Sequence, residues 1–159
     1  MTKIKNPYNE IPGYNCFGCS SRNPIGLHLD FELADDAVVT HWQPTSSYQG
    51  WDNILHGGII ATLLDEAASW AVQAFLDTCG VTSSLNVKYL KPVAVDKGVV
   101  RVEARLSDQP DKCHVVVSAR LYDSESILCA IADVNYYLYT TDEATEKFSY
   151  RGRRELGLE

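Results

Sequence analysis

A long apolar segment, residues 57–77, is the feature that most limits what this chain can fold into. Its apolar residues recur every three or four positions, so at about 100° per residue they share one broad helix face. The apolar positions are Ile59, Ile60, Leu63, Leu64, Ala67, Ala68, Ala71 and Phe75. Gly80 is expected to end this helix. Such a face must be covered by other elements, which predicts a central helix.

Candidate strands flank the helix on both sides. Two segments, 27–33 and 37–43, precede it and are separated by a hairpin turn, and four follow it, at 81–91, 98–106, 113–122 and 127–139. Each shows the period-two pattern of a strand, and neighbours joined by short turns pair antiparallel. We therefore expect an α+β fold, in which a curved antiparallel sheet of five to six strands wraps a long central helix.

The 159 residues are enough for one domain and one core. Prolines and glycines in 1–26 predict an irregular N-terminal lead-in, and 27–140 form the expected domain. Residues 141–159 are charged and predict a tail or a short helix, which Thr140 and Glu143 would cap as a box.

Charge and cysteine content exclude several classes of protein. With 14 basic and 21 acidic residues the net charge is −7, which argues against a broad basic surface that binds nucleic acid or an anionic membrane. The first residues lack a secretory apolar stretch, and no uninterrupted apolar run approaches the roughly 20 residues of a membrane span. Five cysteines, an odd number without a secretory context, indicate reduced thiols. We expect a cytoplasmic protein.

The start of the long helix carries the strongest chemical signal. His56 is followed by Gly57 and Gly58, and the free N–H groups and positive dipole end at such a position can polarise a carbonyl oxygen, as an oxyanion hole does. Asp65, in the middle of an apolar helix, costs free energy unless it has a partner or a task. It is the candidate base or nucleophile. Both residues also have a structural alternative to a catalytic role. His56 would only form the turn that begins the helix, and Asp65 would be a buried aspartate bonded to backbone or to a partner-chain serine.

Three further stretches accompany this motif. They are 16–19 (CFGC), 23–27 (NPIGL) and 84–92 (SLNVKYLKP). Together with a His-Gly-Gly turn and an Asp nine residues after the His, they resemble the hotdog-fold acyl-CoA thioesterases of the phenylacetate-pathway (PaaI-like) type. The resemblance covers most of residues 14–139.

The resemblance implies a mechanism and an assembly. The Gly57 N–H would polarise the thioester carbonyl of an acyl-CoA, while Asp65 activates water or attacks directly, with no cofactor and no metal. Gly57 and Asp65 are eight residues apart, about 12 Å along a helix, which is too far for both to act on one carbonyl group. Antiparallel helices across a two-fold axis would bring them together from two chains, so we expect a homodimer or homotetramer.

The chain departs from that family at Gly50, where some members carry an Asn or Gln that holds water or the carbonyl. Gln49 or Asn53 would have to compensate. Thr82 and Ser83 lie where the family often places a hydroxyl that positions water. Glu66, on the polar side of the helix, is the reserve carboxylate, and solvent or an interface is its expected surroundings.

Several residues are candidates for ligand binding, and each of them also has a structural explanation. Lys88, Lys91 and Arg101 are candidates for the phosphates of coenzyme A, or else form a solvated strand face. The basic residues at 151, 153 and 154 are further candidates for the nucleotide, or else belong to a mobile tail. The three tryptophans are candidates for an acyl pocket, with core packing favoured for at least two. They are Trp42, Trp51 and Trp70.

Cys16 and Cys19 form a C-x-x-C pair, a spacing typical of zinc or redox sites. Zinc usually takes four ligands, and no second close pair exists, although His28 or the Cys113-His114 pair could approach in space. We favour a turn with buried thiols and no metal.

Two other functions remain open. One is an acyl-CoA binding module without turnover, which the glycine at position 50 favours. The other is a hotdog dehydratase or hydratase, which needs a His and an acid converging on adjacent carbons; no Asp followed closely by a His supports it.

Overall fold

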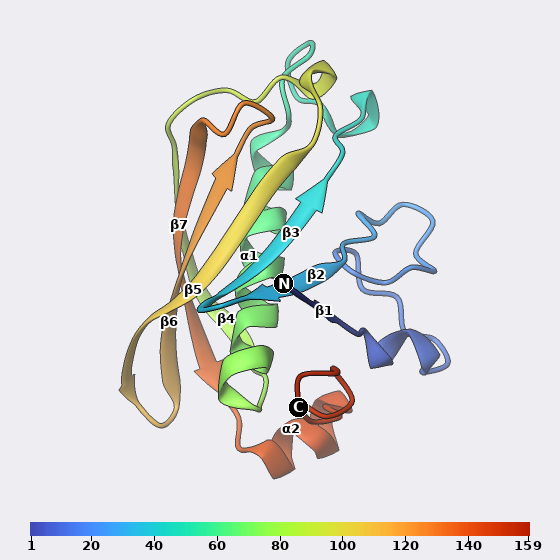
Figure 1. The fold of residues 1–159 in the computed structure, drawn as a ribbon, viewed down its shortest axis with the longest axis vertical. Coiled ribbons are helices and arrows are strands. Elements are labelled where there is room, and N and C mark those ends of the chain that lie inside the picture. Colours follow the sequence, from blue (N-terminus) through green and yellow to red (C-terminus); the bar gives the residue numbers. More distant parts are fainter.

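The computed structural model describes residues 1–159, and its elements wrap one long helix in one sheet (Figure 1). The strands are β1 Thr2–Ile4, β2 Phe31–Ala34, β3 Ala37–Trp42, β4 Gly80–Tyr89, β5 Val100–Asp111, β6 His114–Tyr122 and β7 Leu128–Leu138. The helices are α1 Gly57–Leu76 and α2 Thr141–Phe148, with short 3-10 turns at Pro7–Glu10, Ser46–Tyr48 and Val95–Lys97.

All strands join one antiparallel sheet in the order β1-β2-β3-β5-β6-β7-β4. It curves around α1, which confirms the predicted α+β arrangement of a hotdog fold. The sheet has seven strands rather than five or six. The additional one, β1, lies in the segment predicted to be irregular and pairs Thr2–Ile4 with β2. Three residues are too few to show a period-two pattern.

The C-terminal end of α1 differs from the prediction. The helix stops at Leu76, because Asp77 takes a left-handed conformation (φ 50°) as C-cap. Its Oδ1 accepts hydrogen bonds from the Tyr150 hydroxyl (2.8 Å) and the Arg153 N–H (3.1 Å), which hold it there. Aspartate is one of the few residues that visits this region readily. Gly80, predicted to end the helix, is instead the first residue of β4.

The strand before the first hairpin is shorter than predicted. Leu27 and Leu29 are buried as the alternation requires, but their N–H groups donate to Phe17 and Gly18 of the preceding turn, not to a neighbouring strand. His28 between them has a positive φ of 55°. The sheet ladder therefore begins only at Phe31.

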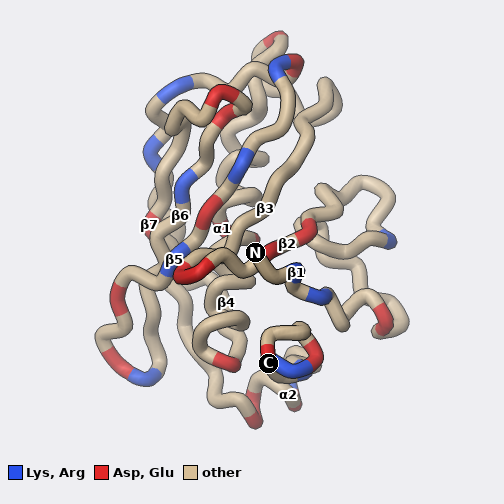
Figure 2. Tube along the Cα trace, in the orientation of Figure 1, with Lys and Arg blue, Asp and Glu red and all other residues tan.

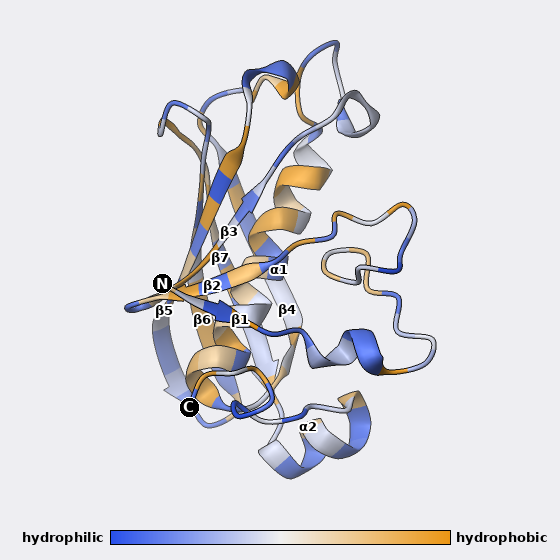
Figure 3. Ribbon diagram, turned by 45° about the vertical axis from the view of Figure 1, so that its right-hand side comes forward, coloured by the Kyte–Doolittle hydropathy of each residue, from blue (hydrophilic) through white to orange (hydrophobic).

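The core lies between α1 and the concave face of the sheet, and Figure 3 shows apolar residues gathered along both. Trp42 and Trp70 are buried there, whereas Trp51 is 87% exposed, so two of the three tryptophans are core residues as predicted. By length and composition α1 would pass as a membrane span; in this structure it is the central helix, with more than half of its most apolar window buried.

The C-terminal segment is ordered against the domain. Thr140 and Glu143 form the predicted capping box, which confirms the short helix α2. Beyond it Tyr150 and Leu156 are buried, and the Leu156 carbonyl accepts a hydrogen bond from the Lys5 N–H (2.9 Å). Residues 141–159 thus cover the C-terminal end of α1, beside the first residues of the chain (Figure 1).

Candidate functional site

His56 sets the entry into α1. It is the N-cap residue, and its Nδ1 accepts a hydrogen bond from the Gly58 N–H (2.9 Å). A ring nitrogen that accepts carries no proton, so the neutral ring bears its proton on Nε2. The cap satisfies Gly58 and leaves the Gly57 N–H without an acceptor in the helix or the loop. One free N–H therefore stands at the positive end of a 20-residue helix.

Gly57 is fixed by a hydrogen bond on one side and faces an open hollow on the other. Its carbonyl accepts a hydrogen bond from the Tyr89 hydroxyl (2.6 Å), which ties the helix start to the end of β4. A Cβ at this position would meet the Tyr89 ring at 3.4 Å. A hollow of about 500 Å³ lies on the other side, formed by Gly50, Trp51, Ile54, Leu55, His56 and Gly57.

Asp65 lies two turns further along the same helix and is half-buried. Its Oδ1 accepts hydrogen bonds from the Thr82 hydroxyl (2.8 Å) and the Tyr136 hydroxyl (2.7 Å). Its second carboxylate oxygen has no partner in the chain. The carboxylate is thus fixed in direction through one oxygen and available through the other, which is the arrangement that a base or nucleophile needs.

Tyr136 is the residue of this group that the sequence pattern does not single out. It is buried on β7, and its hydroxyl also donates to the Asp65 backbone carbonyl (2.7 Å). Burial and the neighbouring Asp65 raise the pKa of Tyr136, so the hydroxyl stays protonated and donates. An inward-facing tyrosine among small residues of β7 is the only signal that the sequence offers.

A β-bulge between Thr82 and Ser84 decides which side chains of β4 face the helix. Adding one residue reverses the alternation, so Thr82 faces Asp65 while Asn86 and Lys88 line the outer face. Ser83 sits at the bulge, and its hydroxyl donates to the Asn135 carbonyl (3.0 Å). Of the two predicted water-positioning hydroxyls, the structure brings only Thr82 to Asp65.

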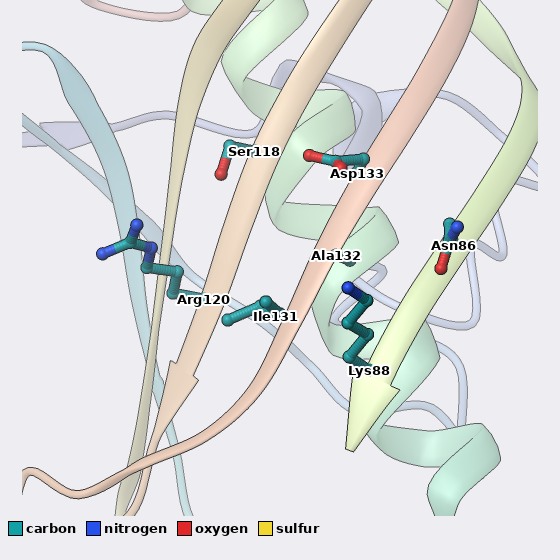
Figure 4. A pocket seen from close by; sticks show the side chains of 7 residues that line it. All are labelled: Asn86, Lys88, Ser118, Arg120, Ile131, Ala132 and Asp133. Carbon is teal, nitrogen blue, oxygen red and sulfur yellow. The ribbon is translucent and has the colours of Figure 1, made fainter. Parts of the chain in front are cut away.

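Two of the three predicted phosphate-binding residues, Lys88 and Arg101, lie away from this site. Lys88 lines a hollow of about 310 Å³ on the outer face of β4, β6 and β7, opposite Arg120, with α1 behind the strands (Figure 4). Arg101 is paired with Glu103 and covers the Tyr122 ring at 4.3 Å on the same outer face. Lys91 is exposed just after β4. Figure 2 shows basic residues spread over the strands and loops, with acidic ones between them.

The residues expected to compensate for Gly50 are used within their loop. Gln49 accepts a hydrogen bond from the Asn53 N–H (3.1 Å), and the Asn53 amide donates to Asp96 (3.0 Å). Asn53 itself has a positive φ of 58°, which asparagine tolerates. A Cβ at Gly50 would stand 3.6 Å from His56, so a longer side chain there would reach the helix entry.

Glu66 does not have the solvated surroundings expected of the polar helix side. Its carboxylate accepts hydrogen bonds from the Cys16 thiol (3.4 Å) and the Trp70 indole (3.3 Å). Burial raises the pKa of Glu66 to about 7. The lead-in folds over this side of α1, which helical periodicity alone does not reveal.

Replacing Tyr136 by Phe tests the anchoring of Asp65. The variant loses a hydrogen bond to a charged group, so we expect a free energy of unfolding lower by about 2 kcal/mol. If Asp65 acts in catalysis, kcat falls by roughly tenfold because the carboxylate loses its fixed direction. Denaturant unfolding and initial rates measure both effects. The control is Tyr137→Phe, since Tyr137 is 40% exposed on the same strand. Equal losses in the two variants would contradict a specific role for Tyr136.

Within one chain the fold keeps the two candidate groups apart. The Gly57 N–H and the Asp65 carboxylate lie about 12 Å from each other along α1; the N–H has no acceptor, whereas the carboxylate accepts from Thr82 and Tyr136. Together they define a class of protein: a helix wrapped by an antiparallel sheet, with a free N–H at the start of the helix and an anchored carboxylate in its middle.

Comparisons with known proteins place the chain in a family. Residues 52–130 match the model of the thioesterase superfamily. The "Putative esterase SSO1253" of Saccharolobus solfataricus is 36% identical over 98 residues, which is 60% of this chain and 63% of that protein. The residues that match the family model include the helix entry, α1 and strands β4, β5 and β6. The chain belongs to the thioesterase superfamily.

Solved structures share the fold. The thioesterase superfamily protein RHA08564 has a TM-score of 0.70 at 21% identity, covering 77% of this chain and 62% of that one. A hypothetical thioesterase with coenzyme A from Streptococcus pneumoniae has a TM-score of 0.64 at 22% identity, covering 70% and 85%. A phenylacetic acid degradation-related protein from Ralstonia eutropha has a TM-score of 0.63 at 22% identity, covering 70% and 85%. The chain spans less than two thirds of SSO1253 and of RHA08564.

Proposed function

We propose that this protein is an acyl-CoA thioesterase of the phenylacetate-pathway (PaaI-like) type, hydrolysing a thioester to a free acid and coenzyme A. The observation that carries the proposal is the Asp65 carboxylate, held through one oxygen by Thr82 and Tyr136 with the other oxygen free. The family model, the coenzyme A named with one structural neighbour and the phenylacetic acid degradation named with another support it.

The chemistry follows from the two groups. The free oxygen of Asp65 takes a proton from water, and the water oxygen forms a bond to the thioester carbonyl carbon. The carbonyl oxygen becomes an oxyanion that accepts a hydrogen bond from the Gly57 N–H. The carbon–sulfur bond then breaks, and the proton returns from Asp65 to the departing thiolate. In direct attack, Asp65 would bond to the carbonyl carbon and the carbon–sulfur bond would break, releasing coenzyme A as its thiolate and leaving an acyl anhydride; water then hydrolyses the anhydride to the free acid and the Asp65 carboxylate, and the proton released goes to the thiolate.

A second copy of the chain completes this site in our proposal. Strand β4 is the last strand of the sheet, so one side of its ten residues has no partner strand, and Val81, Leu85 and Tyr89 on it are exposed. A long edge with exposed apolar side chains favours pairing with another chain. Tyr89 contacts Gly57 and Thr82 contacts Asp65, so a copy seated along β4 lies beside both groups. We propose a homodimer, or a tetramer built from it.

The direct test is thiol release from a panel of acyl-CoA esters that vary in chain length and include aryl thioesters. We expect turnover for at least one ester, with the acyl preference set by the pocket that two chains form. Tight acyl-CoA binding without thiol release across the panel would instead favour the binding module. One observation supports this second function. Gly50 leaves the hollow beside His56 without an amide side chain that could hold water or the carbonyl.

Replacing Lys91 by Ala tests the phosphate contact. Lys91 follows Tyr89, whose hydroxyl contacts Gly57, whereas Lys88 and Arg101 lie on the outer face. We expect KM to rise by roughly threefold with kcat unchanged, because an exposed ion pair contributes little. Lys88→Ala and Arg101→Ala are the matched controls and should leave KM unchanged. A larger rise in either control than in Lys91→Ala would assign the phosphates to the outer face.

The dehydratase alternative finds no support in the geometry. His56 uses Nδ1 to cap α1, and no acidic side chain contacts its ring. We also propose that the protein works in the cytoplasm, because all five cysteines are unpaired.

A further inference from the structure

The lead-in and helix α1 bring three ligand-type side chains together outside the proposed active site. The Sγ atoms of Cys16 and Cys19 and a carboxylate oxygen of Glu66 all lie within 4.8 Å of one another. Cys16 Sγ and Glu66 Oε1 are 3.4 Å apart. In a tetrahedral zinc site with Zn–S near 2.3 Å and Zn–O near 2.0 Å, neighbouring sulfur and oxygen ligands stand roughly 3.5 Å apart. The spacing of the three atoms therefore fits one small cation.

The turn that carries the two thiols is built against the helix. Gly18 lies so close to Glu66 that a Cβ there would stand 2.5 Å from the carboxyl carbon. The Phe17 and Gly18 carbonyls accept hydrogen bonds from Leu27 and Leu29 at 2.8 and 2.9 Å, which pin the turn from outside. Only glycine at position 18 lets the carboxylate approach the two thiols, so the cluster does not result from loose packing.

Charge gives the third argument. The cluster holds three acidic groups in partly buried surroundings, and Glu66 takes part in no salt bridge. The side chains bonded to the cluster are neutral: the Trp70 indole N–H donates to Glu66, and the Tyr14 hydroxyl and the Cys19 thiol share a hydrogen bond of 3.0 Å. A divalent cation would therefore meet no competing cationic side chain at these three groups, and its binding would release the thiol protons.

We propose that Cys16, Cys19 and Glu66 bind a thiophilic divalent cation, zinc, with the fourth position left to water or another small ligand. Two thiolates select zinc over magnesium or calcium, which prefer oxygen ligands. The bound ion would fasten the lead-in to α1 one residue beyond Asp65. His28 and the Cys113-His114 pair, the further ligands that the sequence leaves open, have other partners: His28 contacts the Asn23 carbonyl and His114 contacts Asp111.

Cobalt binding tests the site in the full-length reduced protein. Adding Co²⁺ alone should give one equivalent of bound metal per chain, with thiolate-to-cobalt charge transfer in the near ultraviolet and the visible bands of a tetrahedral ion. Zn²⁺ should displace it and raise Tm by roughly 5–10 °C at about 100-fold above its Kd. Absence of a thiolate-to-cobalt band in reduced protein, or isolation of the pair as a disulfide that does not yield a metal site on reduction, would overturn the proposal.

Variants assign the ligands. Cys16→Ser, Cys19→Ser and Glu66→Gln should each weaken Co²⁺ binding by about 100-fold or more, since even an outer partner of a ligand is worth 10–100-fold. Cys113→Ser is the matched control, because Cys113 is an exposed thiol outside the cluster, and it should bind like the wild type. Glu66→Gln is nearly isosteric and keeps a neutral side chain beside Trp70, so it reports on ligation even if a cysteine variant folds poorly. Wild-type affinity in Glu66→Gln would refute the three-ligand site. These readouts do not depend on thioester hydrolysis.

Discussion

The variant Asp65→Asn is expected to lower kcat for acyl-CoA hydrolysis by roughly 10²–10⁴-fold while the protein stays folded. The amide keeps the shape of the side chain, and its oxygen can still accept from Thr82 and Tyr136. What it loses is the free carboxylate oxygen that takes the proton of water or attacks the carbonyl. Thiol release under saturating substrate measures the loss, and thermal unfolding confirms that the fold is retained.

The control for this variant is Asp133→Asn. Asp133 is exposed on the outer face of β7, on the other side of the sheet from Asp65, and it should have near wild-type kcat and KM. A rate for Asp65→Asn within a few-fold of wild type would refute Asp65 as base or nucleophile. Glu66, whose carboxyl faces Cys16, would not replace it from that position.

The variant Gly57→Pro is expected to lower kcat by roughly 10²–10³-fold, the usual effect of removing one oxyanion donor. Proline removes the N–H and is well tolerated at the first position of a helix. The preceding residue, His56, has φ −60° and ψ 132°, which is the conformation that a residue before proline favours. The cap from His56 to Gly58 can therefore persist.

Gly57→Ala is the matched control, because it adds a Cβ at a similar distance from Tyr89 but keeps the N–H. It should retain most of the activity, so a loss in both variants would point to packing against Tyr89 instead of a missing donor. Steady-state rates of the two variants, measured with their unfolding curves, separate these outcomes.

Mixing the two inactive chains distinguishes a shared site from a site within one chain. If Asp65 of one chain acts with Gly57 of the other, a mixed dimer of Asp65→Asn and Gly57→Pro has one site with both groups intact. After unfolding and refolding together, about a quarter of wild-type activity should return, since half of the dimers are mixed and one of their two sites works. No recovery, with mixed dimers shown to form, would contradict a site built across two chains.

Much of this protein follows from its sequence because the controlling patterns are local. The three- and four-residue spacing of 57–77 requires a helix with one broad apolar face, and the period-two segments around it require strands to cover that face. The His-Gly-Gly turn predicts a free N–H at the helix start. In the structure His56 caps the Gly58 N–H, which leaves the Gly57 N–H free. Thr140 and Glu143 likewise form their box within four residues.

Only the tertiary structure decided which side chains meet across long separations. A single bulge in β4 turned Thr82 toward Asp65 and Lys88 away from it, and no periodicity predicts where one extra residue enters a strand. Tyr136 reached Asp65 through sheet pairing, and the lead-in placed Cys16 against Glu66 on the helix side that the pattern leaves polar. Helix and strand periods report which face of an element is covered, but long-range packing determines what covers it.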